Sequence, residues 1–166
     1  MITDPYLTRS LGFLLGDTSR LMRKRFDGRV RALGLTRAQW RVLARLRRRE
    51  GINQTELAEI LEIETITLGR HIDRLEAKGW VERRRDPNDR RAWNLFLNPK
   101  VQPVMDKMRV YSEMTRKEAL AGIAQSDSEL LIDLLLQIKG NMLELERAEK
   151  SSENAKGKAK ELTSVT

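Results

Sequence analysis

Apolar residues recur at helical spacing over residues 7–33, and this pattern predicts a first long helix there. Thr3 or Asp4 can cap its start, and Pro5 suits the first turn, where a missing N–H costs nothing. Gly34 supplies a stop. We therefore expect this helix to end just before Gly34.

A second helix is expected to follow. Thr36 and Gln39 have the spacing of a capping box, which predicts its start, and Gly51 should close it. Its inner face carries Trp40, Leu43 and Leu46. An arginine run on the same helix is typical of a solvated face that adds background positive potential: Arg45, Arg47, Arg48 and Arg49.

Residues 53–78 predict two short helices separated by a turn. Asn53 and Glu56 have capping-box spacing before a helix over 53–61, and the next helix spans 65–78. The second helix carries an inward apolar stripe, because three of its residues fall within about 60° of one another at about 100° per residue. These residues are Leu68, Ile72 and Leu75.

Two strand-like runs come next, at residues 80–85 and 90–97, with the polar tip Asp86-Pro87-Asn88-Asp89 between them. A helix pair followed at once by a basic hairpin is the layout of a winged helix-turn-helix. Such a shape suits the grooves and backbone of duplex DNA. This segment therefore predicts DNA binding.

The rest of the chain predicts two more helices and a tail. Pro99 suits the first turn of a long helix that extends towards Ile123. Ser126 and Glu129 have capping-box spacing before a last helix, which reaches about residue 149. From about Ser151 the chain turns polar and small, which is typical of a disordered tail over 151–166.

The last helix is apolar around most of its circumference, so it must be buried on more than one side. The small winged segment cannot cover it together with the other terminal helices. A second copy of the chain is the simplest cover, because closed two-fold dimers are the commonest oligomers. A three-helix cluster within one chain is the alternative. The residues concerned are Leu130, Leu131, Ile132, Leu134, Leu135 and Leu136.

Together these elements predict a mainly α fold with a small β-hairpin, in which a winged helix-turn-helix is flanked by N- and C-terminal dimerisation helices. A chain of 166 residues is of single-domain size. We expect one domain over 1–150, with a DNA-binding head at 35–99 and dimerisation helices at 3–33 and 99–149.

The charge distribution agrees with a nucleic-acid partner. The formal net charge of +8 favours a polyanion, either nucleic acid or an anionic membrane. Residues 1–99 hold 21 Lys and Arg against 13 Asp and Glu, whereas residues 100–166 hold 11 of each. The positive excess lies in the part that contains the expected head, and a merely solubilising surface does not predict this segregation.

Composition also excludes several classes of function. The chain has no cysteine, which excludes disulfides, thiolate nucleophiles, cysteine-ligated zinc and thiol-based redox sensing. We find no nucleophile–base pair, metal cluster or Gly-rich phosphate loop, so neither enzyme activity nor a cofactor is expected. No secretory signal or apolar run of 18 residues is visible, which predicts a cytoplasmic protein with no membrane partner.

The helix over 65–78 should place its non-core face in the major groove, which is about wide enough for one helix. Arg70 is the candidate for a bidentate contact with guanine, and a solvated helix-face arginine is the alternative. Thr65 and Thr67 can reach phosphates or a thymine methyl. The full set expected on this helix is Thr65, Thr67, Leu68, Arg70, His71 and Arg74.

His71 and Gly69 each allow two interpretations. His71 lies between the inward stripe and the outer face, so it either contacts a base or phosphate or is a structural, hydrogen-bonded residue. A lone histidine does not suit a metal site. Gly69 costs about 1 kcal/mol relative to alanine in mid-helix, which indicates either a close neighbour or neutral drift.

Two other groups are expected near DNA. Asn53, Gln54 and Thr55 offer backbone amides and polar side chains to a phosphate at a helix N-terminus. The hairpin has arginines on both strands, but successive strand residues face opposite sides, so not all of them can contact DNA. The contacts expected in this wing are Arg84, Asn88, Asp89, Arg90 and Arg91.

Over residues 65–91 the chain resembles the MarR family of bacterial transcription regulators, most of all its SlyA branch. The resemblance is carried by Leu-Glu-Ala-Lys-Gly-Trp-Val-Glu-Arg at 75–83 and by the Asp-Pro-Asn-Asp-Arg-Arg wing at 86–91, and it extends over about 7–149. It implies a nucleoid-associated homodimer whose first, fifth and sixth helices interlock and hold two heads over a pseudo-palindromic operator in double-stranded DNA. Asp89 and Arg91 match the wing's Asp-x-Arg, whose arginine enters the minor groove, and Arg70 matches a groove-reading arginine.

The resemblance also implies an effector. Many members are repressors that release DNA when a small phenolic or other aromatic acid binds between the dimer helices and the head, and the SlyA branch often acts as a counter-silencer. A ligand pocket near Arg20, Thr36 and Trp40 follows by position, although Trp40 suits a plain core equally well. Thiol-sensing members need a cysteine and urate-responsive members a tryptophan in the first helix region, and both are absent here.

The sequence thus predicts a dimeric, sequence-specific DNA-binding transcriptional regulator. The alternative is a winged-helix protein-interaction module, or a nucleoid-associated binder, without operator preference. The two differ in whether a single DNA sequence is selected from a random pool.

Overall fold

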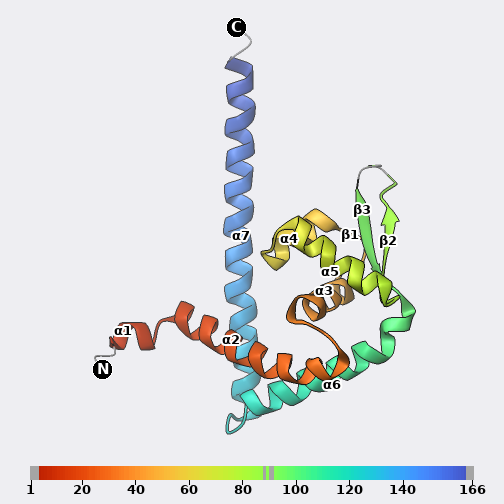
Figure 1. Ribbon diagram of the computed structural model, residues 1–166. Helices are drawn as coiled ribbons and strands as arrows, with labels where there is room; N and C mark the ends of the chain where they lie inside the picture. The colour runs from red at the N-terminus through yellow and green to blue at the C-terminus, as the bar shows by residue number, and fades with distance from the viewer. Residues whose placement is uncertain (1–3, 88, 90–91, 164–166) are drawn as a thin grey trace. The chain divides into compact units, whose positions relative to one another are not determined.

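The computed structural model describes residues 4–87, 89 and 92–163, with side chains for all of these except Pro5 and residues 152–163 (Figure 1). The chain forms two compact units, Met1–Ala119 and Leu120–Thr166, where the sequence predicts one domain over 1–150. The expected fold class is confirmed, because the chain is mostly helical with one small antiparallel sheet. Within the described residues, no helix combines the length and apolar character needed to cross a membrane.

The first expected helix is interrupted. It forms as α1 (Pro5–Thr8), α2 (Leu11–Val30) and a short 3-10 helix (Arg31–Leu33). Asp4 caps α1, because its side chain accepts the Tyr6 N–H at 2.9 Å, and Gly34 ends the segment with φ of 68°. The expectation of one continuous helix is wrong at Ser10, whose backbone is extended so that it stands at the N-cap of α2. Serine favours that position over a helix interior.

The next helix, α3 (Arg37–Arg48), begins as expected. Thr36 Oγ1 accepts the Gln39 N–H at 3.3 Å, and Gln39 Oε1 accepts the Thr36 N–H at 3.1 Å, which completes the capping box. The helix ends at Arg48 instead of Gly51. Gly51 has φ of 73° and makes the turn into strand β1 (Ile52–Asn53).

The winged head over 35–99 contains α4 (Gln54–Leu61), α5 (Thr65–Ala77), β2 (Val81–Arg85) and β3 (Trp93–Leu97). The sheet has the order β1-β3-β2, with all pairs antiparallel. Strand β1 was not predicted, because a run of two residues has no detectable periodicity; it forms by pairing Ile52 with Leu95. The wing is the β2–β3 hairpin, whose register pairs Val81 with Leu97 and Arg85 with Trp93.

The core of the head joins all of its helices to the sheet. The inward stripe of α5 is confirmed, since its three residues have no exposed surface. They pack with apolar residues that the capped helices α3 and α4 and the strand β3 contribute. The fully buried large side chains include Leu43, Leu46, Leu57, Leu61, Leu68, Ile72, Leu75 and Leu95.

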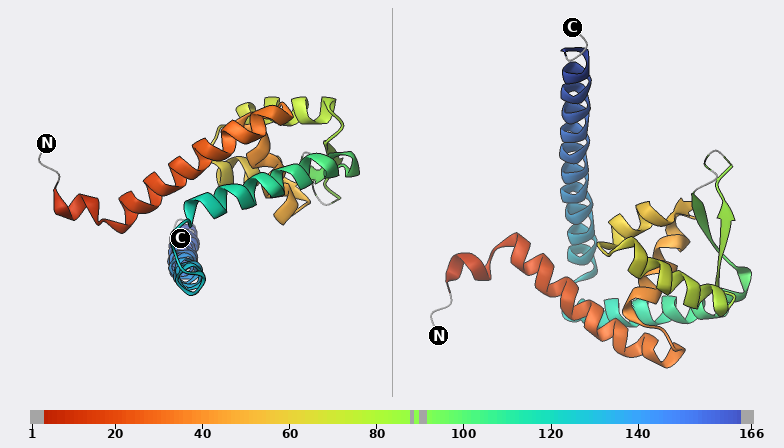
Figure 2. Two further views of the ribbon diagram at one scale, coloured as in Figure 1. Left: turned by 90° about the horizontal axis from the view of Figure 1, so that it is seen from below. Right: turned by 45° about the horizontal axis from the view of Figure 1, so that its top comes forward.

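A short 3-10 helix, Pro99–Val101, leads into α6 (Gln102–Ala119), which ends before the expected Ile123. Helices α2 and α6 lie side by side (Figure 1, Figure 2). The Glu118 carboxylate of α6 forms salt bridges with Arg25 at 3.0 Å and with Arg29 at 2.5 Å. Arg29 also donates a hydrogen bond to Thr115 Oγ1 at 2.8 Å. This clamp fixes α2 against α6 near the end of the latter.

The second unit consists of α7 (Gln125–Thr163) and the residues around it. The helix begins before Ser126, so the capping box expected there is wrong; Glu129 instead accepts a bond from Gln125 Nε2 at 2.9 Å. The helix also continues past Ser151, where a tail is expected. Alanine and lysine in that segment are good helix formers, which offsets its polar composition.

The Glu118 clamp predicts a specific acid dependence. Hydrogen bonds from Arg25 and then Arg29 lower the pKa of Glu118 from 4.5 to about 2. A carboxylate with a lowered folded-state pKa stabilises the fold above pH 4.5, and this contribution is lost as the pH falls towards 2. Glu118→Gln should therefore weaken the pH dependence of the free energy of unfolding between pH 4.5 and 2, measured by urea titration. Glu113→Gln, at an exposed glutamate on the same helix, is the control, and equal slopes for both variants would contradict the clamp.

Candidate nucleic-acid interface

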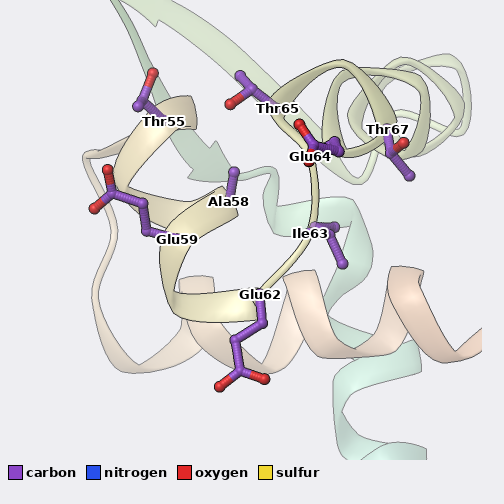
Figure 3. Close-up of a pocket in the computed structure, with 8 residues that line it drawn as sticks. All are labelled: Thr55, Ala58, Glu59, Glu62, Ile63, Glu64, Thr65 and Thr67. Atoms are coloured by element: carbon purple, nitrogen blue, oxygen red, sulfur yellow. The ribbon is translucent and has the colours of Figure 1, made fainter.

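The helix pair is set by caps at both ends of α4. The Asn53 side chain accepts the Glu56 N–H at 2.8 Å and so occupies the N-terminal cap. At the other end Glu62 adopts a left-handed conformation with φ of 54°, and its N–H bonds to Glu59 O at 3.0 Å. Ile63 then bonds back to Ala58 O at 3.1 Å. Because these bonds close the turn tightly, α5 starts two residues later at a fixed angle to α4 (Figure 3).

The outer face of α5 is polar, basic and exposed. Thr65, Thr67, Arg70 and Arg74 are all exposed, as expected for a surface that meets another molecule. Leu68 is the exception among the expected contacts: it has no exposed surface, so its inclusion as a DNA contact is wrong. Leu68 belongs to the inward stripe of α5 and therefore lies in the core, not on the outer face of the helix.

A close contact between α4 and α5 explains the mid-helix glycine. A Cβ added to Gly69 would lie 3.2 Å from Gln54 Nε2, which is tighter than an ordinary contact. Gln54 Nε2 also donates to Thr65 O at 3.3 Å. Of the two interpretations of Gly69, the close neighbour is therefore the one that the structure supports, and Gln54 acts at least partly as a link between the two helices.

His71 is half-buried on α5. Its Nδ1 is buried and has no hydrogen-bond partner among the described residues, so no hydrogen bond at that nitrogen supports the structural interpretation. Burial, and to a smaller extent the charge of Arg74, lowers the pKa of His71 below its usual value. A neutral ring is therefore favoured at this edge of the face.

The expected contacts at the two helix starts and in the wing come together. One hollow of about 380 Å³ is lined by residues from the start of α4, the start of α5 and the wing. Asp89 and Trp93 form the wing side of this hollow. The helix residues that line it are Asn53, Gln54, Thr55 and Thr65.

Wing arginines are held by aromatic rings. The guanidinium of Arg84 lies 4.2 Å from the ring centre of Phe96, and Arg84 also pairs with Glu82. Arg85 lies 4.9 Å from the ring centre of Trp93, its cross-strand partner. Stacking of this kind holds an arginine side chain in one orientation on the wing. The other expected wing contacts, Asn88, Arg90 and Arg91, lie outside the described residues.

Arg83 points the other way, towards α5. Its NH2 group lies 2.6 Å from Asp73 Oδ1 and its NH1 group 2.5 Å from Glu76 Oε2, and the backbone N–H of Arg83 also donates to Glu76 Oε1 at 3.3 Å. The side chain is only 18% exposed. Arg83 therefore joins the wing to the helix, in line with the expectation that the wing arginines do not all face the same side.

A second hollow, of about 640 Å³, lies between α2, α3 and α6. Trp40 and Phe26 both line it, and their rings pack edge-on with centres 4.8 Å apart. The indole Nε1 of Trp40 donates to Asp27 Oδ1 at 2.7 Å. Of the three residues expected near a ligand pocket, only Trp40 lines this hollow: Arg20 pairs with Asp17, and Thr36 caps α3. The cationic residues of its lining are Arg23, Arg47, Arg48, Arg109 and Arg116.

A third hollow, at the turn between α4 and α5, has an acidic rim. It is lined by Glu59, Glu62 and Glu64 together with two threonines of α5. Figure 3 shows the side chains of Glu59 and Glu62 pointing away from the centre of the hollow. The described residues contain no cluster of His, Cys, Asp or Glu that could hold a metal ion.

The comparisons with known proteins agree with this geometry. The model of the MarR family matches residues 35–93. The transcriptional regulator PA3341 is 38% identical, with a TM-score of 0.68 over 79% of this chain and 96% of its own. A MarR transcriptional regulator from Methanosarcina mazei is 25% identical, with a TM-score of 0.73 over 81% of this chain and 97% of its own. The apo form of MarR from E. coli is also 25% identical, with a TM-score of 0.70 over 83% of this chain and 98% of its own. The chain belongs to the MarR family of transcriptional regulators.

Proposed function

We propose that the protein is a homodimeric, sequence-specific DNA-binding regulator that places α5 in the major groove and the wing on the minor groove of a pseudo-palindromic operator. The outer face of α5 carries the proposal: a helix with one fully buried stripe presents exposed threonines and arginines on the other side. A major groove admits one such helix. The wing motif over 86–91 supports placing the protein near the SlyA branch of the family.

The electrostatics of the head support phosphate contact. Two of the carboxylates on α5, Asp73 and Glu76, are paired with Arg83, so their charge is offset within the protein. Among the described residues Arg70 and Arg74 form no salt bridge, and both are exposed on the same side of α5 as Thr67. Asn53, Gln54 and Thr55 stand at the start of α4, where backbone amides favour an anion.

The dimer is supported by apolar surface that the single chain leaves exposed. Such surface on several faces of one helix marks an association site, because water contact with large apolar patches is unfavourable. The N-terminal helices expose further large apolar residues, including Phe13 and Leu14. On α7 the exposed residues include Leu130, Leu131, Ile132, Leu134, Leu136 and Leu145.

The proposal predicts a defined binding pattern. Light scattering should give twice the mass of 19.2 kDa. Selection from random duplex DNA should enrich one palindrome with half-sites about one helical turn, or about 10 base pairs, apart. Affinity should fall with salt with a log–log slope of about −0.9 per phosphate contacted. Arg70→Ala should relax base preference at one position of each half-site, whereas Arg45→Ala on α3 should leave the preference unchanged.

Three outcomes would contradict the proposal. A monomer, or a protein that ignores duplex DNA at low ionic strength, would overturn it. A flat result in the selection, with binding that depends on salt but not on sequence, would favour a nucleoid-associated or protein-interaction module instead.

We also propose that a small aromatic acid acts as effector in the hollow between α2, α3 and α6. Its lining combines Phe26, Trp40 and methionines with the arginines named above, and no acidic side chain is among the described lining residues. A lining that is both apolar and cationic suits a flat ring that carries one carboxylate. Because α3 belongs to the head and α2 and α6 flank it, such a ligand can bias the position of the head.

Salicylate is the probe for this site. It should release the selected duplex in a mobility-shift titration, and Arg116→Gln should raise the concentration for half-release about tenfold by removing one carboxylate partner. The neighbouring exposed Lys117→Gln, which does not line the hollow, is the matched control. If salicylate and related aromatic acids leave the complex intact, or if both variants respond like the wild type, this assignment of the hollow is wrong.

A further inference from the structure

An exposed isoleucine stands on the outer face of α5. Ile66, the second residue of that helix, is 75% exposed. The other exposed large apolar side chains among the described residues of the head, Ile60 and Trp93, are 38% and 39% exposed. A single exposed apolar residue is ordinary on a protein surface, so its position on the helix has to decide whether it has a role.

That position is the centre of the outer face. At about 100° per residue, Ile66 lies about 180° from Leu75 and about 160° from Leu68, both of which are fully buried. Arg70 is one turn further along the same side, because residues four apart are neighbours on a helix. Helical side chains lean towards the N-terminus, so Ile66 projects over the start of α5, the end that enters a groove in many helix-turn-helix proteins.

The chemistry of the major groove restricts what such a side chain can contact. Guanine, adenine and cytosine present hydrogen-bonding groups there, and thymine adds a C5-methyl group, which is the apolar feature of the groove. A branched aliphatic side chain can bury against that methyl but satisfies none of the polar edges. The pair Ile66 and Arg70 therefore combines one residue suited to thymine with one suited to guanine.

We propose that Ile66 reads a thymine methyl in each half-site, on the same side of the groove as the guanine read by Arg70. This inference rests on the proposed function and adds a base-specific contact to it. Four residues of helix advance about 6 Å, and base pairs are about 3.4 Å apart, so the thymine lies about two base pairs from the guanine. Thr67 also carries a methyl group and is exposed on the same helix, so the test must separate these two residues.

Replacing thymine by deoxyuridine removes only the methyl group and keeps the base pair. In the selected operator, each thymine is replaced in turn, symmetrically in both half-sites, and affinity is measured by fluorescence anisotropy at fixed salt. The wild type should lose about fourfold per half-site at one thymine, the loss expected for one buried methyl group. Ile66→Ala should bind the unmodified operator more weakly by a similar factor and show no further loss with deoxyuridine.

Three variants complete the cycle. Ile60→Ala truncates an exposed isoleucine on α4, and Thr67→Ser removes the threonine methyl; both should keep the wild-type sensitivity to deoxyuridine. Ile66→Val should keep part of the wild-type sensitivity to deoxyuridine, because valine retains a branched aliphatic side chain. Because Ile66 is exposed, its replacement should leave the thermal unfolding midpoint unchanged.

The outcomes separate the inference from the proposed function. If the wild type selects an operator but no thymine replacement weakens binding, or if Ile66→Ala keeps full sensitivity, the role of Ile66 is overturned while DNA recognition stands. If only Thr67→Ser loses the sensitivity to deoxyuridine, the methyl contact belongs to Thr67, and the role of Ile66 is overturned as well. A wild type that selects no duplex sequence would overturn both.

Discussion

One guanidinium ties the α5 helix to the wing, and the whole nucleic-acid interface depends on it. Arg83 extends from β2 to two carboxylates of α5, at 2.6 Å from Asp73 and 2.5 Å from Glu76, and little of its side chain meets water. A planar guanidinium with several donors is suited to holding two acids in one geometry. If α5 turns relative to the sheet, these bonds break and leave the Arg83 guanidinium without its partners, which is costly because that side chain is only 18% exposed. Helix and wing are therefore expected to meet DNA as one rigid body.

The other contacts of the interface are arranged around that link. Arg83 offsets two negative charges that would otherwise face a phosphate backbone from α5. The next two arginines of β2 stack on aromatic rings, Arg84 on Phe96 and Arg85 on Trp93. The Gln54 side chain closes the gap between α4 and Gly69. Away from the interface, the Glu118 clamp sets α2 against α6, next to the hollow proposed for the effector.

Local patterns gave correct expectations where a few neighbouring residues decide the structure. The cap at Thr36, the cap at Asn53 and the stop at Gly34 depend on contacts within about one turn, and the stripe of α5 follows from the helical spacing of three apolar residues. Features that depend on distant residues were not predictable: the two-residue strand β1 exists only through its pairing with β3, and the direction of Arg83 is set by acids on another element. The box at Ser126 failed because serine and glutamate three apart also occur inside helices. Helical spacing alone places Ile66 opposite the buried stripe of α5, but its 75% exposure is a property of the folded head.

The most direct test of a rigid helix–wing unit compares two variants at Arg83 in one affinity measurement on the selected operator. Arg83→Met removes the link and leaves two unpaired carboxylates on α5, whereas the triple variant Asp73→Asn, Glu76→Gln, Arg83→Met removes the link and the carboxylate charges together. If Arg83 positions the wing, both variants should bind at least tenfold more weakly than the wild type while unfolding cooperatively. If the triple variant binds as tightly as the wild type, Arg83 acts only by offsetting charge, and the account of a rigid unit is contradicted.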